Sequence, residues 1–111
     1  MIDPQTFFSV EMRVGRIVAA SRFEKARKSA YKLRIDFGEL GVKGSSAQIT
    51  DLYQPEELLG RKVVAVVNLP AKQIADFLSE CLLLGVDLPG KGVALLSVDR
   101  IEDIPDGSRV Y

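Results

Sequence analysis

The chain has 111 residues, of which 47% are apolar and 27% charged, and its formal net charge is zero. A chain of this size and composition forms one globular domain, and zero net charge argues against a protein that holds nucleic acid by bulk attraction alone. Histidine is absent and there is one cysteine, so the commonest general base and the usual ligands of a zinc site are missing; we expect no catalytic residue, no metal and no cofactor.

The first half of the chain predicts a helical turn and three strands. Asp3 and Pro4 are typical of a helix start, with aspartate as the N-cap and proline at the first helical position. Apolar and polar residues then alternate along the first strand, and Gly15 is expected to interrupt it as a bulge or bend. Residues 31–38 (YKLRIDFG) alternate cleanly as a second strand with its polar face outward, and residues 45–50 (SSAQIT) predict a third.

The second half predicts a short helix followed by buried strands. Residues 54–60 (QPEELLG) begin with proline at a first helical position, carry two glutamates in the first turn and end at glycine. Residues 68–80 are expected to be a crossing between two buried strands that delivers polar groups to a binding surface. The predicted strands lie at residues 62–69 (KVVAVVNL), 80–86 (ECLLLGV) and 92–98 (GVALLSV), with a short edge strand at 107–111.

The order of three strands, one helix and two strands is that of the OB-fold, a Greek-key barrel. The predicted fold class is therefore all-β: a five-stranded OB-fold barrel with a short helix between strands 3 and 4 and extra C-terminal strands. We expect one domain over residues 1–111, with the barrel itself at about residues 8–86.

Both ends of the chain carry more apolar residues than a small barrel needs. They are Phe7 and Phe8 near the start, the run 93–96, and Val110 and Tyr111 at the end. This surplus predicts a symmetric homodimer. A cover over one end of a barrel would use the same residues, so both arrangements stay open at this point.

The charges are unevenly distributed along the chain. Between Arg13 and Arg34 there are eight cations and one anion, Glu24. The loop over residues 22–30 also carries Phe23, and an aromatic residue among cations suits phosphate contact together with base stacking. A solvated hairpin loop would show the same composition. The candidate phosphate contacts for RNA are Arg22, Lys25, Arg27 and Lys28.

The cellular location of the protein and the redox state of its cysteine are predicted from simple features of the sequence. No apolar run approaches the roughly 20 residues that span a bilayer, so we expect no membrane insertion. The start MIDPQTFF has no basic region leading into an apolar one, and the single Cys81 rules out an internal disulfide. Together these predict a cytoplasmic protein. Cys81 itself is expected to be a small buried residue rather than a nucleophile.

Three stretches together resemble a known family: residues 10–38 (VEMRVGRIVAASRFEKARKSAYKLRIDFG), 45–70 (SSAQITDLYQPEELLGRKVVAVVNLP) and 79–86 (SECLLLGV). They are similar to the tRNA-binding OB domain that is also found in appendages of aminoacyl-tRNA synthetases. Within that family they resemble most the CsaA-type proteins, which are regarded as chaperones linked to protein export. The resemblance implies a homodimeric barrel without catalytic activity, in which the terminal segments help to build the dimer.

A departure from the tRNA-binding relatives bears on the ligand. Those relatives tend to show Ser-x-Gly-Met where this chain has Ser79, Glu80, Cys81 and Leu82. A side chain in place of glycine keeps a ligand farther from the backbone and so changes the groove. The resemblance to the CsaA branch therefore favours polypeptide over tRNA.

The outward positions of the second and third strands give a candidate ligand groove. Lys32 and Arg34 would lie beside Ser46 and Gln48 if these strands pair. The resemblance adds Asn68, which belongs to the matched stretch VVNLP; a local turn bond would otherwise satisfy its amide.

Two more residues of the candidate groove have alternative readings. Phe77 is expected either in the core or as the apolar wall of a peptide pocket, and Ser79 either ends a loop or donates into the groove. Two functions follow. The first is a chaperone-like homodimer that binds extended or unfolded polypeptides in two grooves, one per subunit; the alternative is a structure-specific tRNA-binding module.

Overall fold

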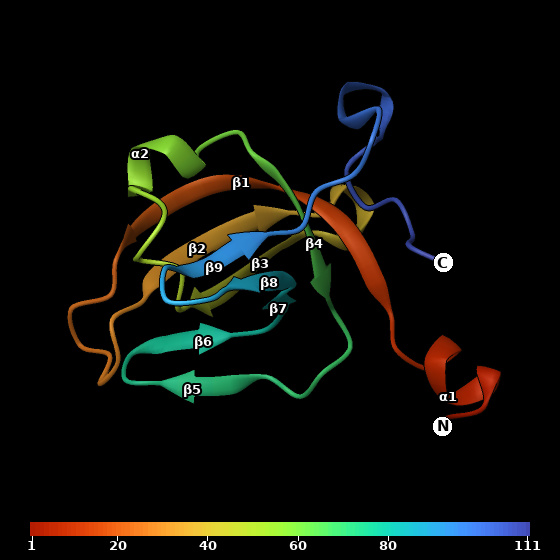
Figure 1. The fold of residues 1–111 in the computed structure, drawn as a ribbon, viewed down its shortest axis with the longest axis horizontal. Coiled ribbons are helices and arrows are strands. Elements are labelled where there is room, and N and C mark those ends of the chain that lie inside the picture. The colour runs from red at the N-terminus through yellow and green to blue at the C-terminus, as the bar shows by residue number, and fades with distance from the viewer.

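The computed structural model describes residues 1–111, and its centre is a five-stranded antiparallel sheet in the order β3-β2-β1-β4-β7. The sheet curls into a nearly closed barrel (Figure 1), in which β3 and β7 face each other across the remaining seam. This confirms the predicted OB-type fold. The barrel strands are β1 (Met12–Arg22), β2 (Tyr31–Asp36), β3 (Val42–Ala47), β4 (Lys62–Val66) and β7 (Leu82–Leu83).

Two hairpins and a few short helices surround the barrel. The predicted short helix between strands 3 and 4 is confirmed, as are the extra C-terminal strands. No helix has the length and apolar character needed to cross a membrane. The surrounding elements are α1 (Pro4–Phe8), α2 (Pro55–Leu58), the hairpin β5 (Lys72–Ile74) and β6 (Phe77–Ser79), the hairpin β8 (Gly85–Leu88) and β9 (Gly92–Leu95), and 3-10 turns at Gly38–Leu40 and Ile101–Asp103.

The barrel core follows from the strict alternation of β2. Tyr31, Leu33, Ile35 and Phe37 are at most 1% exposed, because every second side chain of a strand points to the same face. Residues from the other barrel strands and Leu58 of α2 complete one continuous cluster. The inward face expected for residues 31–37 is therefore confirmed.

The bulge of the first strand lies away from Gly15. Gly15 pairs regularly with Val63 of β4, and the shift in register with β2 falls between Ile17 and Ala19. Glycine is required here for close packing, because a Cβ at this position would lie 2.6 Å from Cγ2 of Ile35. Of the two readings of Gly15, the bulge was wrong, because glycine serves close strand packing as well as irregular backbone.

Three other segments differ from the sequence-based prediction. The third strand was expected at residues 45–50 and lies at Val42–Ala47. Residues 68–80 were expected to be a crossing, and they hold the β5–β6 hairpin, which projects beside the barrel (Figure 1). Residues 80–86 were expected to be one strand, and they divide between β7 and β8. The division falls at Gly85, where a Cβ would lie 2.5 Å from Val93, so β8 leaves the barrel to pair with β9.

The C-terminal strap, residues 104–110, lies along the first half of β1. The N–H of Gly107 donates to the carbonyl of Val14 at 2.7 Å, and the N–H of Val110 donates to that of Met12 at 2.9 Å. This part of β1 is not paired with β2, so the strap covers its free edge. The edge strand predicted at residues 107–111 is thus reduced to a single bridge, from Arg109 to β1.

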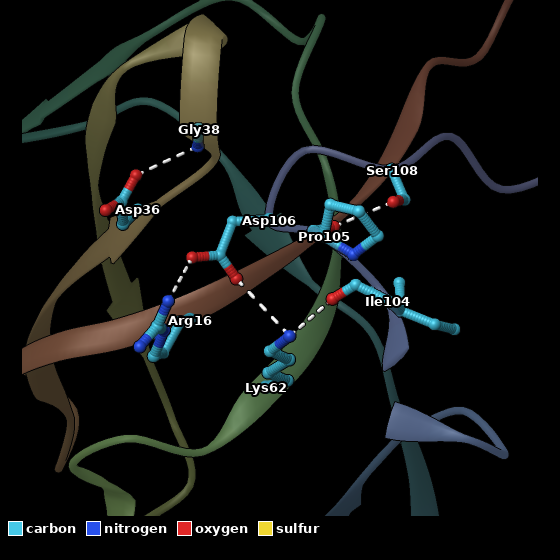
Figure 2. Close-up of polar contacts among 8 residues, drawn as sticks. All are labelled: Arg16, Asp36, Gly38, Lys62, Ile104, Pro105, Asp106 and Ser108. Atoms are coloured by element: carbon cyan, nitrogen blue, oxygen red, sulfur yellow. Dashed lines mark hydrogen bonds and ion pairs between the residues drawn. The ribbon is translucent and has the colours of Figure 1, made fainter. Parts of the chain in front are cut away.

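An ion cluster holds the strap (Figure 2). The carboxylate of Asp106 lies 2.6 Å from Arg16 and 3.7 Å from Lys62, and the Lys62 ammonium also donates to the carbonyl of Ile104. The Asp106 side chain is only 11% exposed. Its hydrogen bond and charge raise the pKa of Arg16. The strap is therefore tied by side chains as well as by backbone.

Replacing Asp106 with alanine is expected to loosen the strap. The change leaves Lys62, a half-buried cation, without its carboxylate, and removes the bond to Arg16. Hydrogen exchange should quicken at the amides of Gly107 and Val110, and the melting temperature should fall by about 5 °C. Asp103→Ala, at an exposed carboxylate, is the matched control; equal exchange rates in the two variants would contradict this role of Asp106.

Candidate ligand-binding site

The pairing of β2 with β3 brings four of the predicted groove residues to one outer surface. Lys32 lies directly opposite Ser46, as expected. The Lys32 ammonium is 5.4 Å from the ring centre of Phe23, and the Arg34 guanidinium is 4.9 Å from that of Phe77. Both cations thus lie over aromatic rings, which attract positive charge.

Phe77 belongs to a small second core rather than to an open wall. It is 6% exposed and meets Phe23 edge to face with ring centres 5.6 Å apart. Ala30 completes this cluster, and the carbonyl of Ala30 accepts from the N–H of Phe23 at the base of the loop. An ion pair of 2.9 Å between Lys25 and Asp76 joins the same loop to the β5–β6 hairpin, and it lowers the pKa of Asp76. Loop and hairpin therefore hold each other in place.

A basic cleft of about 620 Å³ opens between this loop, the end of β3 and β5. Four of its lining side chains are cations and none is acidic. Lys72 lines it as well. This residue lies in the segment 68–80 that was expected to deliver polar groups to a binding surface, but it was not among the candidate site residues. No group of three or more Cys, Asp or Glu side chains in the chain is placed to hold a metal. The cations are Lys25, Arg27, Lys28 and Lys72, and the uncharged walls include Ser46, Gln48 and Gln73.

The cations that are candidates for phosphate contact differ in whether their side chains already have a partner within the chain. Lys25 is paired as described, and Arg22 donates to the side chain of Gln54 at 3.3 Å. Arg27, Lys28 and Lys72 are exposed, and their side chains make no hydrogen bond or ion pair within the chain. These last three are the cations best placed for an anionic ligand.

Not all of the eight cations in the first hairpin belong to this surface. Arg13 is paired with Glu11 at 2.9 Å and donates to the carbonyl of Gly107, while Arg16 is paired with Asp106. Both lie at the strap. The basic surface is therefore confined to the loop and its neighbours, a distinction that sequence order cannot make.

A second cleft, which we call the apolar cleft, lies on the other side of Ser46 and Gln48. It measures about 220 Å³ and opens between the end of β3 and β7, β8 and β9. Six of its ten lining residues are hydrophobic, among them Ile49, Leu83 and Val93. A third cleft, of about 270 Å³, lies on the outer face of β1 and β2 beside Lys32, Arg34 and Phe77.

Asn68 lies apart from these clefts. Its side-chain oxygen accepts from the N–H of Glu11 at 2.9 Å, and its amide nitrogen donates to the carbonyl of Ser9 at 2.8 Å. The amide thus fastens the segment before β1 to the end of β4. The structure does not bring Asn68 together with the other predicted groove residues, and long-range backbone, rather than a local turn, satisfies its amide.

Ser79 and its neighbours close the seam of the barrel. The hydroxyl oxygen of Ser79 accepts from the N–H of Ser46 at 3.1 Å. The N–H of Glu80 donates to the carbonyl of Gly44 at 2.8 Å, and the hydroxyl of Ser45 donates to the carbonyl of Cys81 at 2.9 Å. Ser79 therefore supports one side of the basic cleft through β3.

Cys81 lies buried in this seam, as expected, and is 6% exposed. Burial raises the pKa of its thiol to about 11. Below about pH 8 the thiol is neutral in both the folded and the unfolded chain, so it contributes no pH dependence there. As pH rises from about 9 to about 11, the unfolded chain loses this proton first, and folding stability falls.

A comparison with Cys81→Ala tests this pH dependence. Wild type should lose up to about 2 kcal/mol more unfolding free energy than the variant between pH 8.5 and 11. Denaturant titrations at several pH values measure the difference. Parallel stability curves would contradict a buried, neutral thiol.

A nearly closed five-stranded antiparallel barrel with a cation-lined cleft on its outer surface defines an OB-type domain. Residues 12–109 match the family described as "Putative tRNA binding domain". The chain belongs to this tRNA-binding domain family, as the sequence resemblance indicated.

Solved structures resemble the chain over its whole length. The crystal structure of the chaperone CsaA from Bacillus anthracis is 43% identical, with a TM-score of 0.91, and the match covers 100% of this chain and 99% of that one. The CsaA chaperone protein from Picrophilus torridus is 46% identical, also with a TM-score of 0.91, and the match covers 100% of both chains. The resemblance to CsaA-type proteins is confirmed.

A curated relative is much longer. The methionine–tRNA ligase of Leptospira interrogans is 40% identical over 101 residues, which are 91% of this chain and 14% of the ligase. The chain thus spans about one seventh of the length of that relative. The match concerns one accessory domain of the ligase.

Proposed function

We propose that this chain is a non-enzymatic, chaperone-like protein that binds extended or unfolded polypeptides and takes part in protein export. The observation that carries the proposal is the likeness to CsaA chaperone structures, which extends over both chains at 43–46% identity. A basic and an apolar cleft side by side also suit a polypeptide, whose side chains are mixed in character. The unpaired, buried cysteine fits the reducing cytoplasm, where we expect the protein to act.

The active form in this proposal is a homodimer. No residue of α1 is buried, and Phe7, Phe8 and Tyr111 are 39%, 54% and 86% exposed. In Figure 1, α1 stands away from the barrel on the side where the C-terminus also ends. A second copy would cover this apolar surface. Sedimentation at micromolar concentration tests the point, and a monomeric mass would rule it out.

The second candidate is tRNA binding, favoured by the family match and by the three unpaired cations at the basic cleft. Phosphate contacts make affinity fall steeply with salt, by about 0.7 to 0.9 in log-log slope per contact. A peptide held by one or two charges and by apolar contacts is much less sensitive to salt.

Titrations against tRNA and against a reduced, alkylated unfolded protein, each at 50 and 200 mM salt, separate the two functions. The proposal predicts binding of the unfolded protein with a shallow salt dependence. Tight tRNA binding with a steep slope, and no binding of the unfolded protein, would establish the alternative.

A further inference from the structure

We propose that the polypeptide binds as an added strand on the open edge of β3, with an acidic side chain in the basic cleft and a large apolar side chain in the apolar cleft. This inference rests on the proposed polypeptide binding and specifies its mode and its preferred segment. It is carried by the unpaired backbone at the end of β3, the position of the two clefts, and their opposite chemical character.

The edge of β3 is closed at one end and open at the other. Every second residue of an antiparallel strand directs its N–H and C=O to the same edge. On this edge the carbonyl of Gly44 accepts from Glu80, and the N–H of Ser46 donates to Ser79. The next residue on it is Gln48, whose N–H and C=O make no hydrogen bond with any part of the chain. A free donor and acceptor therefore stand where the seam ends.

The two clefts meet at this open edge. Ser46 and Gln48 line both the basic cleft and the apolar cleft. Lys72 and the loop cations lie on one side of the edge, and Ile49 and Leu83 lie on the other. An extended segment that pairs with the edge therefore passes from cations to apolar walls.

Together the basic cleft, the free backbone at Gln48 and the apolar cleft favour a peptide that has both acidic and apolar side chains. Arg27, Lys28 and Lys72 are unpaired cations in the basic cleft, and only Lys25 has an acidic partner, so the cleft favours carboxylate side chains. The free N–H and C=O of Gln48 pair with a peptide backbone, which supplies both an acceptor and a donor. RNA phosphate groups supply acceptors alone, and their charges gain nothing in the apolar cleft. The edge and the apolar cleft thus favour a peptide over RNA.

Defined peptides test the preference. Each probe is a fluorescent ten-residue peptide in which three threonines separate a pair of aspartates from a leucine. Both orders are made, with the aspartates before the leucine and after it. At least one order should bind wild type at least tenfold more tightly than the same peptide with lysines for the aspartates or serine for the leucine. Equal affinity for all three compositions would overturn the proposed selection.

Two variants of Gln48 test the added strand. Gln48→Pro removes the free N–H, which the fold itself does not use, and the extended residue before it accepts a following proline. It should weaken peptide binding at least fivefold more than Gln48→Ala does, because the alanine variant loses the same side chain but keeps the N–H. Circular dichroism and melting confirm that both are folded. Equal affinity of the folded variants would overturn strand addition.

Further measurements show whether RNA or a second copy of the chain occupies the edge of β3, and whether the chain binds polypeptide at all. Loss of tRNA binding in Gln48→Pro, without loss of peptide binding, would assign the edge to RNA. A dimer that becomes monomeric in Gln48→Pro would assign it to a second copy. Either result overturns the proposal. If the unfolded protein binds wild type and none of the peptides does, this mode fails while the proposed function stands; if neither binds, both fail.

Discussion

Replacing Gly15 with alanine is expected to destabilise the barrel by about 3 kcal/mol, the upper part of the usual range for overpacking. The added Cβ would lie 2.6 Å from both Ile35 and Phe37, two side chains that are fully buried. Neither can move aside without opening the core, because interiors are closely packed. Denaturant unfolding measures the loss.

Two comparisons show whether the clash is the cause. Ala19→Val enlarges an exposed residue of the same strand and should change stability by less than about 0.5 kcal/mol. Combining Gly15→Ala with Phe37→Leu makes room for the new methyl group, so the double variant should be more stable than the sum of the single effects implies. Strict additivity would show that the clash does not explain the loss.

Charge reversal at Arg27 and Lys28 is expected to weaken tRNA binding, where it occurs, by at least tenfold at 50 mM salt. Both side chains are exposed, unpaired and at the basic cleft, so the change removes two contacts without breaking an interaction of the fold. The log-log salt slope should become shallower by about 1.4 to 1.8. Filter binding over a series of salt concentrations gives both quantities.

The matched control reverses the same number of charges elsewhere. Lys91→Glu with Arg100→Glu alters two exposed cations outside the basic cleft and leaves the net charge equal to that of the test variant. A control that weakens tRNA binding equally would mean that net charge, rather than the cleft, governs association.

Most of the barrel could be predicted from local pattern. The alternation of residues 31–37 predicts the inward face of β2, and the structure confirms it. In residues 45–50 the apolar Ala47 and Ile49 alternate with polar residues, and the structure buries both. The pairing of Lys32 with Ser46 followed once two neighbouring strands were joined by a hairpin. The helix at Pro55 and its stop at Gly60 were likewise readable from proline and glycine.

The candidate site was predicted less completely. Lys72 was missed because a hairpin of three-residue strands carries too few positions to show a period. Asn68 was assigned to the groove, yet its partners lie 57 and 59 residues earlier in the chain. Arg16 was counted among the eight cations of residues 13–34, and its partner Asp106 lies 90 residues later.

The sequence by itself determined which residues form strands and which of their faces turn inward, because both depend on a repeat of two residues along one segment. The tertiary structure alone decided which cations remain free, which amide fastens the N-terminal segment, and where the edge of β3 stays open. Those features depend on contacts between distant segments, whose positions are set by the curvature of the sheet and the docking of the hairpins rather than by any local repeat.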